Sequence, residues 1–264
     1  MLPKVIEAYS TQGYGVDMGN PTGLYSCLIE KSTGRSLSTG GGITVSDAFL
    51  FSIIARMYNP AAVFVIGNAF GLSTFVLAES FPGALIDVID AEAEGSDNAR
   101  GSEVTRKIAQ SHFPTVQLTT GFSPQDISKA CRVSKYQMAF IDGLHTNEQM
   151  VKDFIGLSPF LDDQCVVVFH DVASHNMLDG WKEIVNLSAK NGFHDFQVSW
   201  TSFGVCVLVR GLPTVQQYFE SCAGSFRGIR YYLGLKSSPH RPKFYNRTLY
   251  EIELYIRKKL GFKV

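Results

Sequence analysis

The stretch VFVIGNAFGLST, residues 63–74, predicts a strand, a tight turn and the start of a helix. Its first part is apolar throughout, as expected for a central strand with helices on both faces of the sheet. Gly67 and Gly71 allow the backbone to turn sharply and to approach a ligand, and the helix that follows offers unpaired N–H groups. The stretch therefore indicates one unit of a parallel α/β sheet, with either a ligand at the turn or only a tight connection there.

Short β-branched runs alternate with helix-like segments on both sides of this turn, which is the pattern of a doubly wound α/β sheet. We expect parallel strands at residues 61–67, 84–90, 115–119, 136–141 and 164–169. We expect helices at 46–58 (capped by Ser46), 72–81, 97–112, 124–132, 147–157, 179–191, 214–223 and 247–260.

Two later strand-like runs, FHDFQVSW and FGVCVLVR, are separated only by Thr201 and Ser202. So short a connection forces an antiparallel hairpin, because a parallel crossover needs about a dozen residues. The predicted fold is a doubly wound, mostly parallel seven-stranded α/β sheet that ends in this hairpin. We divide the chain into an N-terminal cap segment at 1–45, a ligand-binding domain at 46–211 and a basic helical extension at 212–264.

The composition is that of an ordinary globular protein, with 45% hydrophobic and 18% charged residues in a chain of 264. No apolar run approaches the roughly 20 residues of a membrane helix, and the N-terminus lacks the pattern of a secretory signal. The five cysteines are an odd number without paired spacing, which favours reduced thiols over a disulfide framework. We therefore expect a cytoplasmic protein without a membrane span.

Charge is unevenly distributed along the chain. Residues 225–264 contain ten Lys and Arg against two Glu, whereas the first 224 residues contain 14 basic against 22 acidic side chains. Such a basic segment is either a solvated terminal helix or a surface that meets an anion. No nucleic-acid-binding motif accompanies it, so a nucleic-acid partner is not expected.

Acid and imidazole groups recur at the ends of two predicted strands, in FIDGLH (140–145) and FHDVASH (169–175). Asp142 and Asp171 end neighbouring strands, and the carboxyl ends of such strands converge on one crevice. Two carboxylates brought together repel each other unless a cation or a shared proton lies between them. The alternative is that these side chains only cap helices and bind loops.

A divalent metal would satisfy this pair of carboxylates. Carboxylate oxygens alone suit Mg²⁺, and a set that includes His170 suits Mn²⁺, Fe²⁺ or Zn²⁺. The predicted metal ligands are therefore Asp142, His170 and Asp171.

Asp90, at the end of the second strand, lies nineteen residues after Gly71, where an acid can accept hydrogen bonds from the hydroxyls of a ribose. The three-glycine dinucleotide fingerprint is not met, which disfavours NAD. Together, the glycine turn, Asp90, the two acid/imidazole strand ends and the hairpin resemble a class I S-adenosylmethionine-dependent methyltransferase. More narrowly, residues 40–210 are similar to the bacterial small-molecule and sugar O-methyltransferases with Ile-Asp-Gly-x-His and Phe-His-Asp-Val motifs.

The resemblance implies S-adenosyl-L-methionine as the cofactor, with Gly67 and Gly71 beside its methionine part, Asp90 at the ribose, and Phe122 and Ser123 near the adenine. The full set of cofactor contacts implied is Gly67, Asn68, Ala69, Phe70, Gly71, Ser73, Thr74, Asp90, Ala91, Phe122, Ser123 and Asp142.

The implied reaction is O-methylation of a small polar acceptor, such as a sugar, a glycan precursor or a natural product, with or without a divalent metal (Mg²⁺ or Mn²⁺). Transfer from a sulfonium to a hydroxyl needs in-line placement of the reactants and a base that takes the proton. The predicted catalytic residues are His145 as the base, with Asp142 and His170, and His175 is a further alternative for the base.

Two other readings stay open. The same acid/imidazole set would serve a metal-dependent hydrolase or oxygenase. A cofactor-binding module without turnover is the other, because Val65 stands where the family often has an acid. The expected partners are a small-molecule acceptor and a second copy of the chain. The basic segment would suit an anionic acceptor. Segments 1–45 and 211–264 are candidates for an acceptor lid or a dimer contact.

Overall fold

A computed structural model describes residues 2–17, 27–37, 42–93 and 96–224. Its main feature is a seven-stranded sheet in the order β5-β4-β3-β6-β7-β9-β8. The strands are β3 (Ala62–Ile66), β4 (Leu85–Asp90), β5 (Val116–Thr120), β6 (Tyr136–Ile141), β7 (Leu161–Phe169), β8 (His194–Val198) and β9 (Val205–Arg210). Strands β3 to β7 are parallel, and β9 runs antiparallel to both β7 and β8. The predicted fold class is confirmed.

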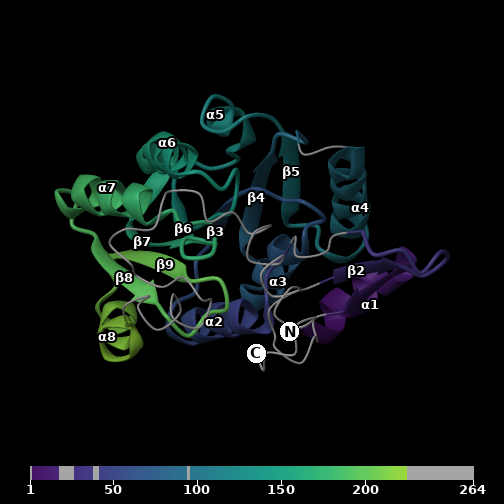
Figure 1. Cartoon of the computed structure of the whole chain (residues 1–264), viewed down its shortest axis with the longest axis horizontal. Coiled ribbons are helices and arrows are strands. Elements are labelled where there is room, and N and C mark those ends of the chain that lie inside the picture. Colours follow the sequence, from purple (N-terminus) through teal and green to yellow (C-terminus); the bar gives the residue numbers. More distant parts are fainter. Residues whose placement is uncertain (1, 18–26, 38–41, 94–95, 225–264) are drawn as a thin grey trace, which may run out of the picture. The chain divides into compact units, whose positions relative to one another are not determined.

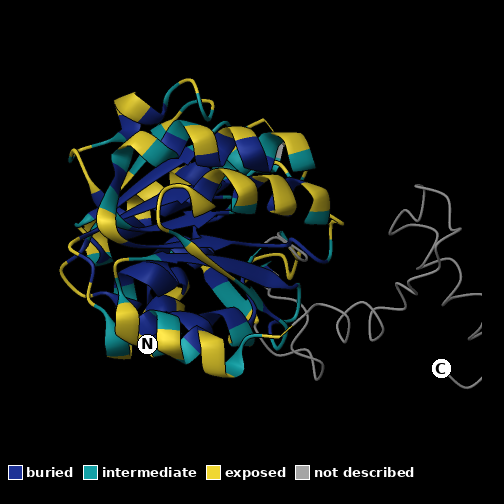
Figure 2. Ribbon diagram, turned by 90° about the vertical axis from the view of Figure 1, so that its left-hand side faces the viewer, coloured by how far each residue is buried: buried dark blue, intermediate teal, exposed yellow. Residues whose placement is uncertain are grey.

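Helices cover both faces of this sheet. They are α2 (Val45–Met57), α3 (Leu72–Ser80), α4 (Ser96–His112), α5 (Ile127–Ala130), α6 (Asn147–Leu157), α7 (Leu178–Ala189) and α8 (Pro213–Cys222), with a short 3₁₀ turn η1 (Ser158–Phe160) before β7. Helices α5, α6 and α7 lie on one side, and α2, α3 and α8 lie on the other (Figure 1). The inner strands β3, β4, β6 and β9 are almost wholly buried, as the dark blue ribbon of Figure 2 shows, whereas the edge strands β5 and β8 are partly exposed. The predicted helix at 247–260 lies outside the described residues.

An N-terminal unit that the sequence did not predict packs against this core. It consists of α1 (Leu2–Thr11) and a separate antiparallel pair of strands, β1 (Tyr14–Asp17) and β2 (Cys27–Glu30). Val5, Ala8 and Tyr9 of α1 are fully buried in the main hydrophobic core. The Tyr9 hydroxyl donates a hydrogen bond of 2.6 Å to the carbonyl of Phe70, so α1 is tied directly to the turn after β3.

Helix α2 begins one residue earlier than predicted, and its cap is Thr44 rather than Ser46. The Thr44 hydroxyl accepts a hydrogen bond from the backbone N–H of Asp47, and the Asp47 carboxylate accepts one from the N–H of Thr44. This reciprocal capping box satisfies two N–H groups at once, which a serine inside the first turn cannot do.

Two other predicted boundaries also differ. Helix α5 is a single turn at 127–130 instead of a helix at 124–132. At its end the backbone N–H of Arg132 donates to the Asp87 carboxylate instead of continuing the helix. The β8–β9 connection spans residues 199–204 rather than two residues. Thr201 holds it closed by accepting from the N–H of Val205 and donating to the carbonyl of Val198. The antiparallel pairing itself is as predicted.

The cysteines are consistent with the expectation of reduced thiols. Among the described side chains, Cys131, Cys165, Cys206 and Cys222 are free. Within the same residues, a helix with the length and apolar character needed to cross a bilayer is not found.

Candidate active site

A cavity of about 270 Å³ opens at the carboxyl edge of the sheet, between the turn after β3 and the ends of β4, β6 and β7. Most of the predicted cofactor and catalytic residues line it: Gly67, Asn68, Ala69, Ser73, Asp90, Ala91, Phe122, Ser123, Asp142, His145, His170 and Asp171. Phe70, Gly71 and Thr74 are not among the lining residues, and Phe70 and Thr74 are buried behind them. The cavity therefore joins the predicted cofactor turn to the predicted acid/imidazole cluster.

The turn after β3 requires glycine at two positions. Gly67 has φ +93°, and a Cβ there would lie 2.0 Å from the carbonyl oxygen of Asp142. Gly71 has φ +81°, and a Cβ there would lie 2.5 Å from the hydroxyl of Thr105 in α4. Both the left-handed backbone and the close approach exclude a side chain. The turn is therefore pressed directly against the end of β6.

Asp90 holds this turn in place through both of its carboxylate oxygens. Oδ2 accepts from the backbone N–H of Asn68 (2.6 Å) and Ala69 (3.2 Å), and Oδ1 accepts from the N–H of Glu92 (2.7 Å). A carboxylate offers about four acceptor positions. The predicted ribose ligand is thus also the anchor of the glycine turn, with acceptor capacity left over.

The cavity also contains a polar pair that was not predicted from the sequence. Gln149 and Asp153 lie one turn apart on α6, and both line the cavity. The Gln149 amide donates to the carbonyl of Ser123 (2.8 Å) and to Asp153 Oδ1 (2.7 Å). Burial raises the pKa of Asp153 above its ordinary value. Gln149 and Asp153 are four residues apart on the helix that follows the Asp-Gly-x-His motif. This spacing places both side chains on one face of the helix and could have predicted the pair.

The predicted acid/imidazole cluster forms at the ends of β6 and β7. His145 Nε2 lies 3.2 Å from Asp142 Oδ1 and 3.2 Å from Asp171 Oδ2. His170 Nδ1 lies 3.1 Å from Asp142 Oδ1 and 3.6 Å from Asp171 Oδ1. The two carboxylates that the sequence placed on neighbouring strands therefore share two imidazole partners.

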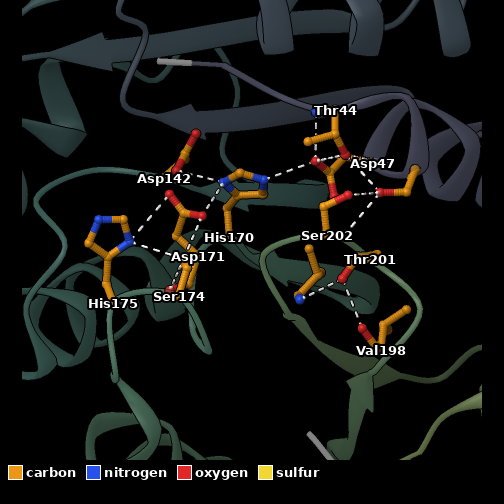
Figure 3. Close-up of polar contacts among 12 residues, drawn as sticks. Thr44, Asp47, Asp142, His170, Asp171, Ser174, His175, Val198, Thr201 and Ser202 are labelled. Atoms are coloured by element: carbon orange, nitrogen blue, oxygen red, sulfur yellow. Dashed lines mark hydrogen bonds and ion pairs between the residues drawn. The ribbon is translucent and has the colours of Figure 1, made fainter. Parts of the chain in front are cut away.

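A third carboxylate belongs to the cluster, although no local pattern in the sequence predicts it. Asp47, in the first turn of α2, lies with Oδ2 3.1 Å from His170 Nε2 and is 1% exposed. Figure 3 shows the His170 ring between Asp142 and Asp171 on one side and Asp47 on the other. The same Asp47 oxygen accepts from the N–H and the hydroxyl of Thr44, each at 2.8 Å. Both ring nitrogens of His170 thus face a carboxylate.

Pairing fixes the charges of the cluster. Burial opposes charge on His145, but its hydrogen bonds to Asp142 and Asp171 outweigh burial and raise its pKa to about 10. For His170, burial is likewise outweighed by Asp142, Asp171 and Asp47, which hold its pKa well above the ordinary value. Burial alone would raise the pKa of Asp142 and of Asp171, but the two histidines outweigh it. The pKa of Asp142 therefore lies below its ordinary value, and that of Asp171 lies well below it. Near neutral pH the cluster is a set of ion pairs.

His175 stands at the outer side of this cluster. Its Nδ1 lies 3.5 Å from Asp171 Oδ2, and its ring stacks on that of His145 with centroids 4.3 Å apart and planes inclined by 16°. Asp171 presents its carboxylate from a left-handed backbone with φ +58°, and the Ser174 hydroxyl donates to its Oδ1 at 2.9 Å. A non-glycine residue in this conformation is uncommon and marks a constrained position.

The comparison with known families agrees with this geometry. Residues 64–172 match a family model described as a methyltransferase domain. These residues form a methyltransferase domain. The matched region runs from β3 to just beyond Asp171, so it contains the glycine turn, Asp90 and the strand-end carboxylates.

Solved structures support the class I methyltransferase fold of this domain. The O-methyltransferase TomG from Streptomyces achromogenes, in complex with SAM, superposes with a TM-score of 0.53 at 15% identity, over 65% of this chain and 82% of that one. An O-methyltransferase from Bacillus cereus, in complex with SAH, gives 0.52 at 16% identity over 64% and 83%. A putative caffeoyl-CoA O-methyltransferase from Staphylococcus aureus gives 0.51 at 18% identity over 63% and 83%. No curated protein sequence matches the chain significantly.

Proposed function

We propose that this methyltransferase domain transfers a methyl group from S-adenosylmethionine to a hydroxyl of a small polar acceptor, as an enzyme of class EC 2.1.1.-. The observation that carries the proposal is that the glycine turn and the acid/imidazole cluster line one cavity. Such a cavity can hold a sulfonium donor against an acceptor oxygen that lies beside a base. A sugar, a glycan precursor or a natural product is the proposed acceptor class.

In this proposal the cofactor lies along the turn after β3. Its methionine part meets Gly67, where a Cβ would collide with the carbonyl of Asp142, and the neighbouring Asn68 and Ala69. The remaining acceptor position of Asp90 receives a ribose hydroxyl. Phe122, whose ring is 59% exposed at the cavity, packs against the adenine.

The acceptor hydroxyl is placed at the cluster of Asp142, His145 and Asp171. His145 is the proposed base, oriented by the two carboxylates that contact its Nε2. Because its pKa is raised to about 10, its neutral form is the minor one near pH 7. His170 has a carboxylate at each ring nitrogen, so we give it a positioning role for Asp142 rather than that of a base.

A divalent metal remains part of the proposal. Ligand atoms of Asp142, His170 and Asp171, the predicted set, lie within 4.8 Å of one another. When bound at this edge of the cavity, an ion would lower the pKa of the acceptor hydroxyl. Ligation by His170 Nδ1 would have to replace its hydrogen bond to Asp142.

Two measurements test the proposed function. Calorimetry with S-adenosylhomocysteine should give one site per chain, and a panel of hydroxylated acceptors should yield S-adenosylhomocysteine only when the methyl donor is present. Continued turnover without the donor would point to the hydrolase or oxygenase instead. Binding without any turnover across the panel would favour the cofactor-binding module. Absence of binding would refute the proposal.

The anionic nature of the acceptor stays a prediction, as does the second copy of the chain as a partner. The basic segment on which the first rests, residues 225–264, lies outside the described residues.

A further inference from the structure

The N-terminal helix α1 packs against α3 and α4 and reaches the glycine turn through one hydroxyl (Figure 1). Tyr9 is fully buried, and its hydroxyl donates to the carbonyl oxygen of Phe70 at 2.6 Å. Burial raises the pKa of Tyr9 well above its ordinary value, so the hydroxyl stays protonated and remains a donor. The ring packs edge-on against Phe75 of α3, with centroids 5.9 Å apart, which fixes the direction of the hydroxyl. The donor is therefore held rigidly at the peptide bond between Phe70 and Gly71.

The turn that receives this hydrogen bond has a backbone that needs support from outside. Gly67, Ala69 and Gly71 have φ values of +93°, +46° and +81°. Ala69 has a Cβ, so its left-handed conformation is strained. Such conformations persist only where the surrounding structure holds them in place. Ala69 also lines the cavity, so the support is needed at the surface where the methyl donor is proposed to bind.

The N-terminal unit also holds the helix that packs on this turn. Gly101 of α4 lies so close to the turn that a Cβ there would be 2.2 Å from the carbonyl oxygen of Ala69. Arg100, the preceding residue, forms an ion pair with Glu30 of β2 and donates to the hydroxyl of Tyr14 in β1 at 3.3 Å. The N-terminal unit thus contacts the turn directly through α1 and indirectly through the first half of α4.

These contacts come from residues outside the matched methyltransferase domain, which begins at residue 64. Helix α1 and strands β1 and β2 do not line the cavity, and Gly42 is the one described residue before β3 that does. Any effect of the N-terminal unit on the donor must therefore pass through the turn that it holds. This role differs from that of an acceptor lid or a dimer contact, because it acts on the donor side of the cavity.

We propose that the N-terminal unit positions the glycine turn for the methyl donor, and that Tyr9 is the residue through which it chiefly acts. Tyr9 is a positioning residue, since it contacts the turn and not the cavity. Donor binding and the contact between Tyr9 and Phe70 then strengthen each other, because coupling between two sites is reciprocal. The inference rests on the proposed function in one respect, that the turn is the donor site.

Donor binding by the full-length protein tests this role. Tyr9→Phe keeps the ring and removes the hydroxyl. In calorimetry it should weaken S-adenosylhomocysteine binding by about fivefold, the factor that one hydrogen bond contributes. Tyr58→Phe is the matched control, because Tyr58 also donates to a main-chain carbonyl, that of Gln164 at 2.9 Å, and neither residue lines the cavity. The control should bind as the unaltered protein does.

Hydrogen exchange separates positioning from packing. S-adenosylhomocysteine should slow the exchange of amides in α1, residues 2–11, in the unaltered protein and in Tyr58→Phe. This protection should be reduced in Tyr9→Phe, because the hydroxyl that links α1 to the turn is missing. A residue that serves packing alone would lower the melting temperature in Tyr9→Phe and leave the protection unchanged.

A second pair of variants tests the route through α4 without changing the core. Glu30→Gln removes the charge that pairs with Arg100 and should weaken S-adenosylhomocysteine binding about twofold, as expected for a partly exposed ion pair. Glu103→Gln is its control, because Glu103 pairs with Lys107 on the exposed face of the same helix. This pair answers the question even if Tyr9→Phe proves too unstable to purify.

The possible failures are distinguishable. Absence of S-adenosylhomocysteine binding in the unaltered protein would refute the proposed function. If the unaltered protein binds and folded Tyr9→Phe binds equally well, the positioning role is overturned while the proposed function stands. Unchanged protection of α1 in Tyr9→Phe would overturn it as well, and so would unchanged affinity in Glu30→Gln if that pair alone can be measured.

Discussion

The glycine turn and the acid/imidazole cluster line one cavity, but they are built by different means. The turn is made of consecutive residues whose backbone N–H groups are bound by Asp90, and its shape follows from Gly67 and Gly71. The cluster is made of side chains from α2 and from the ends of β6 and β7. Local backbone geometry defines the first, and long-range pairing of charges defines the second. Substitutions should therefore affect them in different ways.

The largest effect is expected for Gly67→Ala, because its Cβ would lie 2.0 Å from the carbonyl of Asp142 and force the turn away from the end of β6. S-adenosylhomocysteine binding should be lost in calorimetry, and the melting temperature should fall. Gly83→Ala is the matched control: Gly83 has a similar φ of +89° but open space around its Cβ. If both variants lose the same stability and still bind S-adenosylhomocysteine, steric exclusion of a side chain at Gly67 does not define the shape of the turn.

Asp142→Ala and Asp171→Ala should abolish methyl transfer while leaving the fold intact. Each removes a carboxylate that contacts His145, and loss of a positioned base assembly costs on the order of 10²–10⁴-fold in rate. Turnover with saturating donor is the measurement, with S-adenosylhomocysteine affinity as the check on the turn. Full activity of the folded double variant would remove the cluster from the mechanism.

Asp47→Asn should have a smaller effect, confined to the cluster. The amide oxygen can still accept from Thr44 and keep the helix cap, whereas the negative charge beside His170 is lost. The pKa of His170, followed by NMR, should fall, and kcat should fall about tenfold with cofactor affinity unchanged. Asp47→Ala would also remove the cap and cost about 1 kcal/mol of stability. An unmoved His170 pKa in Asp47→Asn would limit Asp47 to a capping role.

An effect on stability rather than on activity is expected in the pH dependence of unfolding of the metal-free protein. The pKa of His145 rises from 6.5 in the unfolded chain to about 10 in the folded one. Its contribution is therefore complete below pH 6.5 and is lost as pH rises through about 10. Urea unfolding should show the stability gap between the unaltered protein and His145→Gln closing over this range. A constant gap would mean that His145 is not held as a cation.

The same contrast explains how much could be predicted from the sequence. The five parallel strands were located because β-branched runs and intervening helices are local patterns, and β6 at 136–141 matched in full. That Asp142 and Asp171 lie together followed from the rule that parallel strands end at one edge.

Contacts between distant segments could not be predicted in this way. Asp47 and His170 are separated by 123 residues, and an acid in the first turn of a helix is usually only a cap. The N-terminal helix was missed because its short amphipathic pattern gives no sign of what it packs against. The length of the β8–β9 connection was misjudged because apolar residues next to the turn resemble strand residues until Thr201 is seen bridging the loop.

One oxygen atom, Asp47 Oδ2, serves two purposes that are usually kept apart. It closes the first turn of α2 through Thr44, and it neutralises one side of the His170 ring. Fraying of that turn would remove the oxygen from both contacts. The buried His170 imidazolium would then face carboxylates only on the side of Asp142 and Asp171. The first turn of α2 and the charge balance of His170 are thus coupled through a single atom.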